Sequence, residues 1–250
     1  FNLAGYGIDP AERDAEGAYQ INAHLVGAIG EAMAEVRDPA WPGQDLVHAG
    51  SALEYGDVGG NLAEDCDPEP TTLYGQSKLA GTQSLSRCCA DRGLRGLTAR
   101  LFTVYGPGEH PGRLLPSLVR AARTGEPLGL TAGRQRRDFT FVADVAEGLL
   151  RLGLTRARPG DIVNLATGRL VTVRQFAETA ARLLGMPDGR LRFGALPTRP
   201  AEMNHGPVNL DRLRGLIGWT PPTEVTDGIL STVAFEASSQ SREAGHARSK

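Results

Sequence analysis

The sequence predicts an α/β protein built on a doubly wound parallel sheet, and two observations carry this prediction. Short apolar runs alternate with stretches of helical periodicity along most of the chain. Glycines follow several of these segments, at the points where a strand or a helix would end. Parallel strands need long crossover connections, which are usually helices, so the alternation favours a parallel sheet with helices on both faces.

The expected elements follow one another along the chain. Apolar runs predict strands at residues 1–4, 45–49, 96–105, 137–142 and 161–165. Helical periodicity predicts helices at residues 14–36, 74–91, 114–124, 145–154, 173–184, 209–216 and 225–235. Residues 186–207 should be mostly loop, and the polar residues 237–250 should be disordered.

The chain begins inside the first of these apolar runs, at Phe1, with no methionine and no polar lead-in. Chain termini seldom lie within a core strand. We therefore expect further residues before Phe1, and we expect the N-terminal strand-helix-strand units of the sheet to lie among them.

Composition excludes several classes of protein. The net charge is −2 and the arginines are scattered, so no basic stripe indicates binding to nucleic acid or to a membrane surface. The cysteines Cys66, Cys88 and Cys89 fit neither a disulfide framework nor a metal-ligand spacing, and the five histidines show no metal spacing either. With no long apolar run and no signal peptide, we expect a cytoplasmic protein without a metal ion.

Tyr74 and Lys78 form the most informative pair in the sequence. The chain has only two lysines and five tyrosines among its 250 residues, so a Tyr-x-x-x-Lys match should arise by chance in about 0.04 chains. Residues four apart lie on the same face of a helix. A lysine ammonium near a phenol should lower the pKa of the phenol toward the range of a general acid or base, and it leaves donors for a nucleotide ribose.

Polar side chains also follow the predicted strands. In a doubly wound sheet the ligand site lies at the carboxyl ends of the strands. Gly50 and Ser51 follow directly after the strand at 45–49, and Thr103 lies near the end of the strand at 96–105. A serine after a strand commonly caps a loop, so for Ser51 the sequence leaves capping and catalysis both open.

Taken together, these motifs resemble the extended short-chain dehydrogenase/reductase family, the group of nucleotide-sugar epimerases, dehydratases and ketoreductases. The resemblance covers nearly all of residues 1–235, and its motifs keep the family order at residues 1–5, 50–56, 74–78, 100–107, 137–145 and 199–202. It implies a Rossmann-type cofactor domain at 1–107 and 136–166. A smaller C-terminal substrate-binding subdomain is implied at 108–135 and 167–236, with the disordered tail at 237–250.

The resemblance also implies roles for single residues at the reacting end of the site. Ser51, Tyr74 and Lys78 would be catalytic, with Tyr74 transferring the proton and Ser51 bonding the substrate oxygen. Ala4, Gly5 and Asn22 would contact the cofactor together with Tyr74 and Lys78. For Asn22, a structural role in satisfying helix backbone remains equally open.

The remaining implied site residues would hold a nucleoside-diphosphate sugar. Ser51 and Thr103 would contact the sugar, although many family members have asparagine in place of Thr103. Arg137 and Arg199 would bind the diphosphate, since a planar guanidinium suits bidentate binding of phosphate. For Tyr105, a position in the core and a position lining the pocket remain equally open.

One expected feature is absent from these residues. The glycine-rich loop that cradles dinucleotide phosphates would lie before Phe1, together with the residue that selects NAD or NADP. We therefore expect NAD or NADP as cofactor without a choice between them.

The residues after Ser51 narrow the reaction. Dehydratases and decarboxylases of this group carry an acidic residue at one or both of the next two positions, which are Ala52 and Leu53 here. Glu54 should point to the other face of the strand. The sequence thus favours an NAD(P)-dependent nucleotide-sugar epimerase working through a keto-sugar, with an NADPH-dependent 4-keto-sugar reductase as the alternative.

Two further expectations concern partners. The resemblance implies a homodimer that pairs through the helices containing Asn22 and Lys78. A non-catalytic protein that binds a dinucleotide or a sugar nucleotide is a third reading, since fold alone does not fix function. The presence of Ser51, Tyr74 and Lys78 together argues against it.

Overall fold

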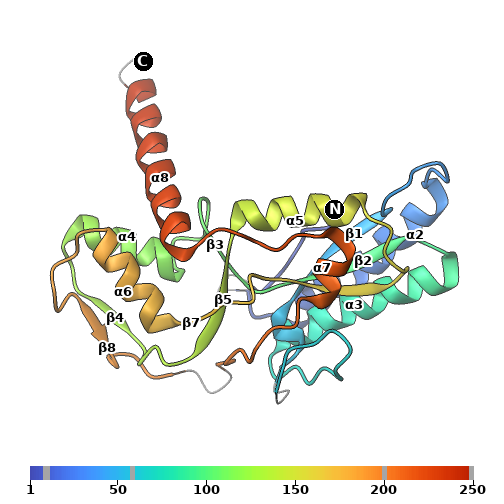
Figure 1. The fold of residues 1–250 in the computed structure, drawn as a ribbon, viewed down its shortest axis with the longest axis horizontal. Coiled ribbons are helices and arrows are strands. Elements are labelled where there is room, and N and C mark those ends of the chain that lie inside the picture. Colours follow the sequence, from blue (N-terminus) through green and yellow to red (C-terminus); the bar gives the residue numbers. More distant parts are fainter. Residues whose placement is uncertain (8–11, 57–59, 199–201, 248–250) are drawn as a thin grey trace.

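A computed structural model describes residues 1–7, 12–56, 60–198 and 202–247, with side chains described up to residue 238. The predicted fold class, an α/β protein with a parallel Rossmann-like sheet, is confirmed. Two lobes lie side by side, each with its own sheet and hydrophobic core (Figure 1). The first lobe is built on strands β1, β2 and β6, and the second lobe on strands β3, β5 and β7.

The sheet of the first lobe is entirely parallel and has the order β1-β2-β6. Its strands are β1 (Leu46–Ser51), β2 (Gly96–Leu101) and β6 (Asp161–Leu165). All six residues of β1 are buried, as expected for a strand covered on both faces. In the register of the sheet Ser51 lies opposite Leu101, so it stands at the carboxyl end, as predicted.

Helices cover both faces of this sheet (Figure 1). One face carries α1 (Ala15–Tyr19), a π-helical turn (Gln20–His24), α2 (Leu25–Val36) and α3 (Leu73–Arg92), and the other carries α5 (Val142–Leu154) and α7 (Asp211–Ile217). The Thr72 hydroxyl caps α3 by accepting a hydrogen bond from the Gly75 N–H at 3.0 Å. Gly93 ends α3 with a left-handed φ of 63°, the conformation that glycine adopts without strain.

The second lobe combines short strands with three helices. In its main sheet β3 (Thr103–Tyr105) pairs parallel with β5 (Arg136–Phe141), which pairs antiparallel with β7 (Leu170–Thr172). A second pair joins β4 (Leu128–Leu130) to β8 (Leu191–Phe193). Helices α4 (Leu114–Thr124), α6 (Val173–Leu183) and α8 (Val225–Ala247) complete it.

Three expectations need correction. The segment 1–4 makes a parallel bridge from Asn2 to His48, but Phe1 and Leu3 are 61% and 62% exposed, so it is not the buried strand we predicted. The predicted strand at 96–105 is two strands in different sheets, because the chain turns at Phe102. Helix α8 continues to Ala247, where we expected disorder from residue 237 on.

Strands β3 and β5 belong to the segments expected in the cofactor domain, yet both pair within the sheet of the second lobe. The sequence also missed β4, β7 and β8, because strands of three residues are too short to show an alternating pattern.

Candidate active site

The structure brings Ser51 and Tyr74 together at the carboxyl end of β1. Ser51 ends the strand, and Tyr74 lies in the first turn of α3, which packs over the short turn Ala52–Glu54. The Ser51 hydroxyl lies near the phenol of Tyr74 and lowers its pKa. Lys78 lies one helical turn further along α3, with its side chain buried.

Ser51 fills one of the two roles that the sequence left open, that of a cap. Its hydroxyl accepts a hydrogen bond from the Leu53 N–H at 3.2 Å and so caps the turn that follows. The Ser51 N–H donates to Oε1 of Glu54 at 2.7 Å, which completes a capping box. Because the cap fixes the Ser51 rotamer, the same hydroxyl is held beside the phenol of Tyr74.

The electrostatics of Tyr74 differ from the prediction. Burial, together with the charge of Glu54, raises the pKa of Tyr74 to about 12, against the lowering effects of Ser51 and Arg113. Lys78 is not among the groups that lower it, so the prediction that the lysine lowers the phenol pKa is wrong for this structure. Tyr74 therefore holds its proton at neutral pH and can act as an acid.

Lys78 is a buried cation. Its side chain is 2% exposed, and burial lowers its pKa to about 8, while the carboxylate of Glu54 acts in the opposite direction. Within the described part of the chain its ammonium group has no hydrogen-bond partner. A buried ammonium with three unused donors suits a ligand hydroxyl brought to the site.

Glu54 is a residue whose importance the sequence did not show. It is fully buried, and its Oε2 accepts hydrogen bonds from Nε of Arg100 and from the Thr82 hydroxyl, both at 3.0 Å. The guanidinium of Arg100 in turn lies over the ring of Tyr55, 4.3 Å from its centroid. Glu54 thus anchors the turn after Ser51 and sets the charge felt by Tyr74 and Lys78.

Asn22 serves the protein itself. The side chain is completely buried in the π-helical turn, where its amide nitrogen donates to the carbonyl of Tyr6 at 2.8 Å and to Ser77 Oγ at 2.9 Å. Its oxygen accepts from the Tyr6 N–H at 2.9 Å. Both amide hydrogens are used, which favours the structural alternative over a cofactor contact. Asn22 ties the segment around Tyr6 to helix α3.

The other two residues expected at the cofactor lie on this N-terminal segment. Ala4 and Gly5 are exposed, and the Ala4 N–H donates to the Asn2 side chain at 3.1 Å. Beyond them the chain passes against Tyr74, because a Cβ placed on Gly7 would lie 3.1 Å from the Tyr74 ring. The segment therefore borders the same site.

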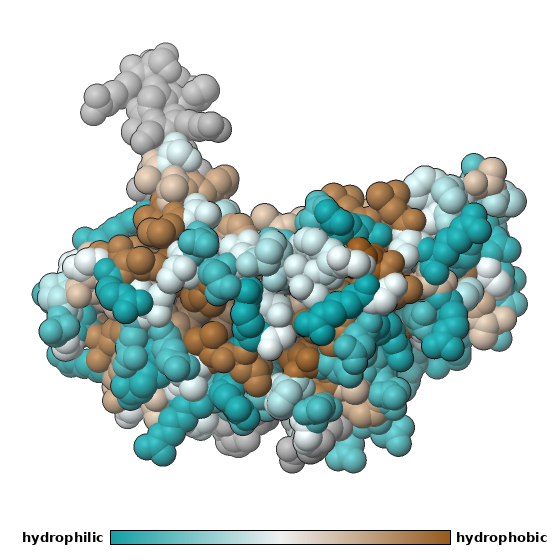
Figure 2. Space-filling view, in the orientation of Figure 1, coloured by the Kyte–Doolittle hydropathy of each residue, from teal (hydrophilic) through white to brown (hydrophobic). Residues whose placement is uncertain are grey.

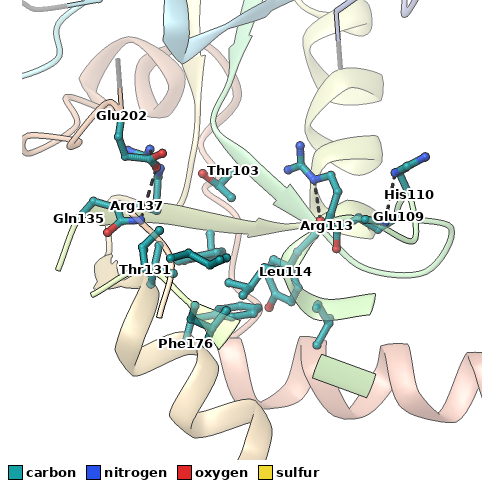
Figure 3. A pocket seen from close by; sticks show the side chains of 17 residues that line it. Thr103, Glu109, His110, Arg113, Leu114, Thr131, Gln135, Arg137, Phe176 and Glu202 are labelled. Atoms are coloured by element: carbon teal, nitrogen blue, oxygen red, sulfur yellow. Dashed lines mark hydrogen bonds and ion pairs between the residues drawn. The ribbon is translucent and has the colours of Figure 1, made fainter. Parts of the chain in front are cut away.

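A cavity of about 360 Å³ lies in the second lobe (Figure 3). Thr103 and Arg137 both line it, and Nη2 of Arg137 makes an ion pair of 2.6 Å with Oε1 of Glu202. Arg199 lies outside the described residues. Tyr105 lines the cavity and is also core, since it is 2% exposed and packs edge-on against Phe176.

Sequence reasoning missed three charged residues that line this cavity: Glu109, Arg113 and Glu202. Nε of Arg113 donates to Oε1 of Glu109 at 2.9 Å, and the positive charge of Arg113 is felt by Tyr74. The spacing of Glu109 and Arg113, four residues apart directly after Gly106-Pro107-Gly108, was the available signal. Arg113 thus links the cavity electrostatically to Tyr74.

Residues 1–166 match the NAD dependent epimerase/dehydratase family. The chain belongs to this family. The recognition made from the sequence is therefore confirmed, as is the expectation of an NAD(P) cofactor, since the family is described as NAD dependent. Lys78, Tyr74 and Ser51 at the carboxyl end of β1 fit such a cofactor, with the lysine ammonium offering unused donors.

Relatives in the family act on several nucleotide sugars. A probable UDP-glucuronate 4-epimerase of Rhizobium meliloti (strain 1021) is 27% identical over 235 residues, which cover 86% of this chain and 67% of that protein. A dTDP-glucose 4,6-dehydratase of Xanthomonas campestris pv. campestris is 27% identical over 205 residues, covering 78% of this chain. The chain spans 61% of the uncharacterized UDP-glucose epimerase YtcB of Bacillus subtilis (strain 168) and 58% of the Xanthomonas protein.

Among solved structures, MoeE5 in complex with UDP-glucuronic acid and NAD superposes with a TM-score of 0.82. It is 27% identical, and the match covers 95% of this chain and 78% of MoeE5. In the described part of the chain, no helix has the length and apolar character to cross a membrane. The same residues contain no cluster of three side chains suited to a metal ion.

Proposed function

We propose that the protein is an NAD(P)-dependent nucleotide-sugar epimerase that works through a keto-sugar intermediate. The observation that carries the proposal is the Ser51 hydroxyl beside the phenol of Tyr74, with the buried Lys78 one turn along α3. The cavity beside it supports a nucleotide sugar, because Arg137 offers a guanidinium for a diphosphate and Arg113 acts electrostatically on Tyr74. Sugar nucleotides named in the relatives support the same substrate class.

In this proposal Tyr74, Ser51 and Lys78 have different roles. Tyr74 exchanges a proton with a sugar hydroxyl at its phenol oxygen, and the Ser51 hydroxyl bonds the same sugar oxygen as its charge changes. Lys78 holds a cofactor hydroxyl and keeps a positive charge near the reacting atoms. A nicotinamide cofactor held there would supply the hydride transfer, and its oxidised form would add a positive charge that favours the tyrosinate.

The reaction type rests on the residues after Ser51. Ala52 is buried and apolar, Leu53 carries no acid, and the carboxylate of Glu54 is held by Arg100 and Thr82. An elimination of water would need a free acid at this place. We therefore favour epimerisation, with the NADPH-dependent 4-keto-sugar reductase as the second candidate because both reactions use the same proton donor.

The test is to incubate the purified protein with uridine, thymidine and guanosine diphosphate sugars, with and without NADPH, and to follow the products by mass and retention. An isobaric product formed without reductant supports an epimerase. A gain of two hydrogens that depends on NADPH supports the reductase. Loss of water would contradict both candidates, and binding without turnover of any sugar would favour the non-catalytic reading.

A further inference from the structure

The cavity of the second lobe has a charged pair at each end. Figure 3 shows Arg137 with Glu202 on one side, Glu109 with Arg113 on the other, and Thr103 between them. Each arginine is paired with one carboxylate, at 2.6 Å for Arg137 and 2.9 Å for Arg113. The pair with Arg113 is the one whose charge reaches Tyr74, so it lies toward the reacting end of the site.

Glu109 has one oxygen without a partner. The side chain is 10% exposed, and its Oε1 accepts a hydrogen bond from Nε of Arg113. Its Oε2 is buried and has no hydrogen-bond partner in the described part of the chain. A buried carboxylate oxygen left without a donor costs free energy, so native proteins rarely keep one without a reason.

The backbone fixes Glu109 in this position. Gly106 has a φ of 142°, and a Cβ at this residue would lie 2.6 Å from Cγ1 of Val142, so the turn that begins here needs glycine. The Glu109 N–H donates to the carbonyl of Gly106, which closes the turn before α4. Glu109 therefore presents its carboxylate from a constrained turn, which suits the recognition of a ligand.

We propose that Oε2 of Glu109 accepts a hydrogen bond from a hydroxyl of the sugar and makes the site select neutral sugars over sugars that carry a carboxylate. The inference rests on the proposed function, because it assumes that a nucleotide sugar fills this cavity. A neutral hydroxyl supplies the donor that Oε2 lacks. A uronate would instead place a second carboxylate beside Glu109, while Arg113 is already paired with Glu109 and Arg137 is assigned to the diphosphate.

The experiment is calorimetric titration of the protein with UDP, UDP-glucose and UDP-glucuronate. We expect UDP-glucose to bind at least about 10-fold more tightly than UDP-glucuronate. In Glu109→Gln, which keeps the shape of the side chain but removes its charge, we expect this ratio to fall below about 3-fold. The affinity for UDP alone should stay unchanged in the variant, which also shows that the variant is folded.

Glu147→Gln is the matched control. Glu147 also pairs with an arginine four residues later, through Nε of Arg151 at 2.7 Å, but on an exposed face of α5 outside the cavity. We expect it to keep the wild-type ratio.

Two results would overturn the inference while leaving the proposed function intact. One is equal or tighter binding of UDP-glucuronate by the wild type, and the other is an unchanged ratio in Glu109→Gln. If none of the three uridine nucleotides binds, this inference falls, and the panel of thymidine and guanosine diphosphate sugars then decides whether the proposed function falls with it.

Discussion

The Tyr74 phenol keeps its proton at neutral pH in this structure, and its proposed role in proton exchange with the sugar depends on that proton. Burial and the charge of Glu54 raise its pKa to about 12, so the side chain is neutral across the physiological range. We predict that Tyr74→Phe lowers turnover by at least about 100-fold, because only the exchangeable proton is lost. Affinity for the nucleotide sugar, measured by calorimetry, should stay within a few fold. Turnover close to that of the wild type would remove Tyr74 from this role.

We expect the charged Lys78 side chain to lower the free energy of unfolding while it serves turnover. Its pKa falls from 10.5 to about 8 on folding, so the unfolded chain binds this proton more tightly, and stability should rise with pH between these two values. At neutral pH the folded protein keeps a buried cation without a bonded partner. We predict that Lys78→Met raises the free energy of unfolding by about 1–3 kcal/mol at pH 7 while abolishing turnover.

Urea unfolding at pH 7 and pH 10 tests this prediction, since the gain should shrink at the higher pH as wild-type Lys78 loses its proton. Tyr74→Phe serves as the comparison that keeps the cation. A loss of stability in Lys78→Met would show that the ammonium is well satisfied by its surroundings.

At the residue scale, the sequence indicated which side chains lie near one another better than it indicated their electrostatics. Ser51 and Tyr74 meet as expected, because a strand end and an i,i+4 pair are local features that sequence spacing reports. The roles of Glu54 and Arg113 depend on side chains brought together from distant segments. No spacing in the sequence shows that Arg100 comes from β2 to bind Glu54.

At the scale of elements, α3 is placed by glycines that face other backbone. A Cβ at Gly75 would lie 2.3 Å from the carbonyl oxygen of Leu53, and one at Gly81 would lie 2.0 Å from that of Asn22. Both distances are far below contact distance. The close approach lets α3 hold Tyr74 and Lys78 against the end of β1.

We predict that Gly81→Ala destabilises the protein by more than about 2 kcal/mol, because the added methyl group cannot fit and its strain exceeds the gain in helix propensity. The matched control is Gly215→Ala in α7, where no atom lies within 4 Å of the added Cβ. That substitution should stabilise by about 0.5–1 kcal/mol. Thermal unfolding of both variants measures the difference, and equal effects would contradict the packing argument.

The long helices were predictable, whereas the short strands were not. Helix α3 carries both its signals in the sequence, Thr72 at the start and Gly93 at the end. The break between β2 and β3 carries no such signal, since it falls at an apolar residue, Phe102, with neither glycine nor proline beside it. The position of this break is set by strand pairing, because β2 joins the sheet of the first lobe and β3 joins the sheet of the second lobe.

At the scale of the whole molecule, two buried histidines should make the fold sensitive to acid. Burial lowers the pKa of His48 and of His205 from 6.5 to about 3, with further lowering by Lys78 and Arg137 respectively. Below pH 6.5 the unfolded chain takes up protons that the folded protein does not, so stability is full above that pH and falls as the pH drops toward 3. We predict a loss of about 2–3 kcal/mol between pH 7.5 and 5.5.

Urea midpoints across this range measure the loss. His48→Asn should reduce the slope by about half, even if the variant is less stable at every pH, because one of two titrating groups is gone. An unchanged slope would show that other groups govern the acid response.

We also predict a homodimer formed through α2 and α3. Asn22 and Lys78 are themselves buried, so the pairing would use the outer faces of these helices. A groove between them is lined by small and charged side chains, Ala23, His24, Gly27, Ala28, Glu31, Ser84, Arg87, Cys88, Asp91 and Arg92. Light scattering at micromolar concentration should give twice the mass of the chain, and Gly27→Arg should yield monomers. A wild-type monomer would contradict the prediction.

The path of the chain between the lobes has a consequence for how the molecule folds. In element order the chain leaves the first lobe after β2, returns at α5, leaves again for β7, returns at α7 and leaves for α8. Neither lobe is a continuous piece of sequence, and each crossing closes a loop through the other lobe. Cooperativity is therefore built into the connectivity. Local melting of one lobe removes the fixed ends that hold the other, so the two should lose structure in a single all-or-none step.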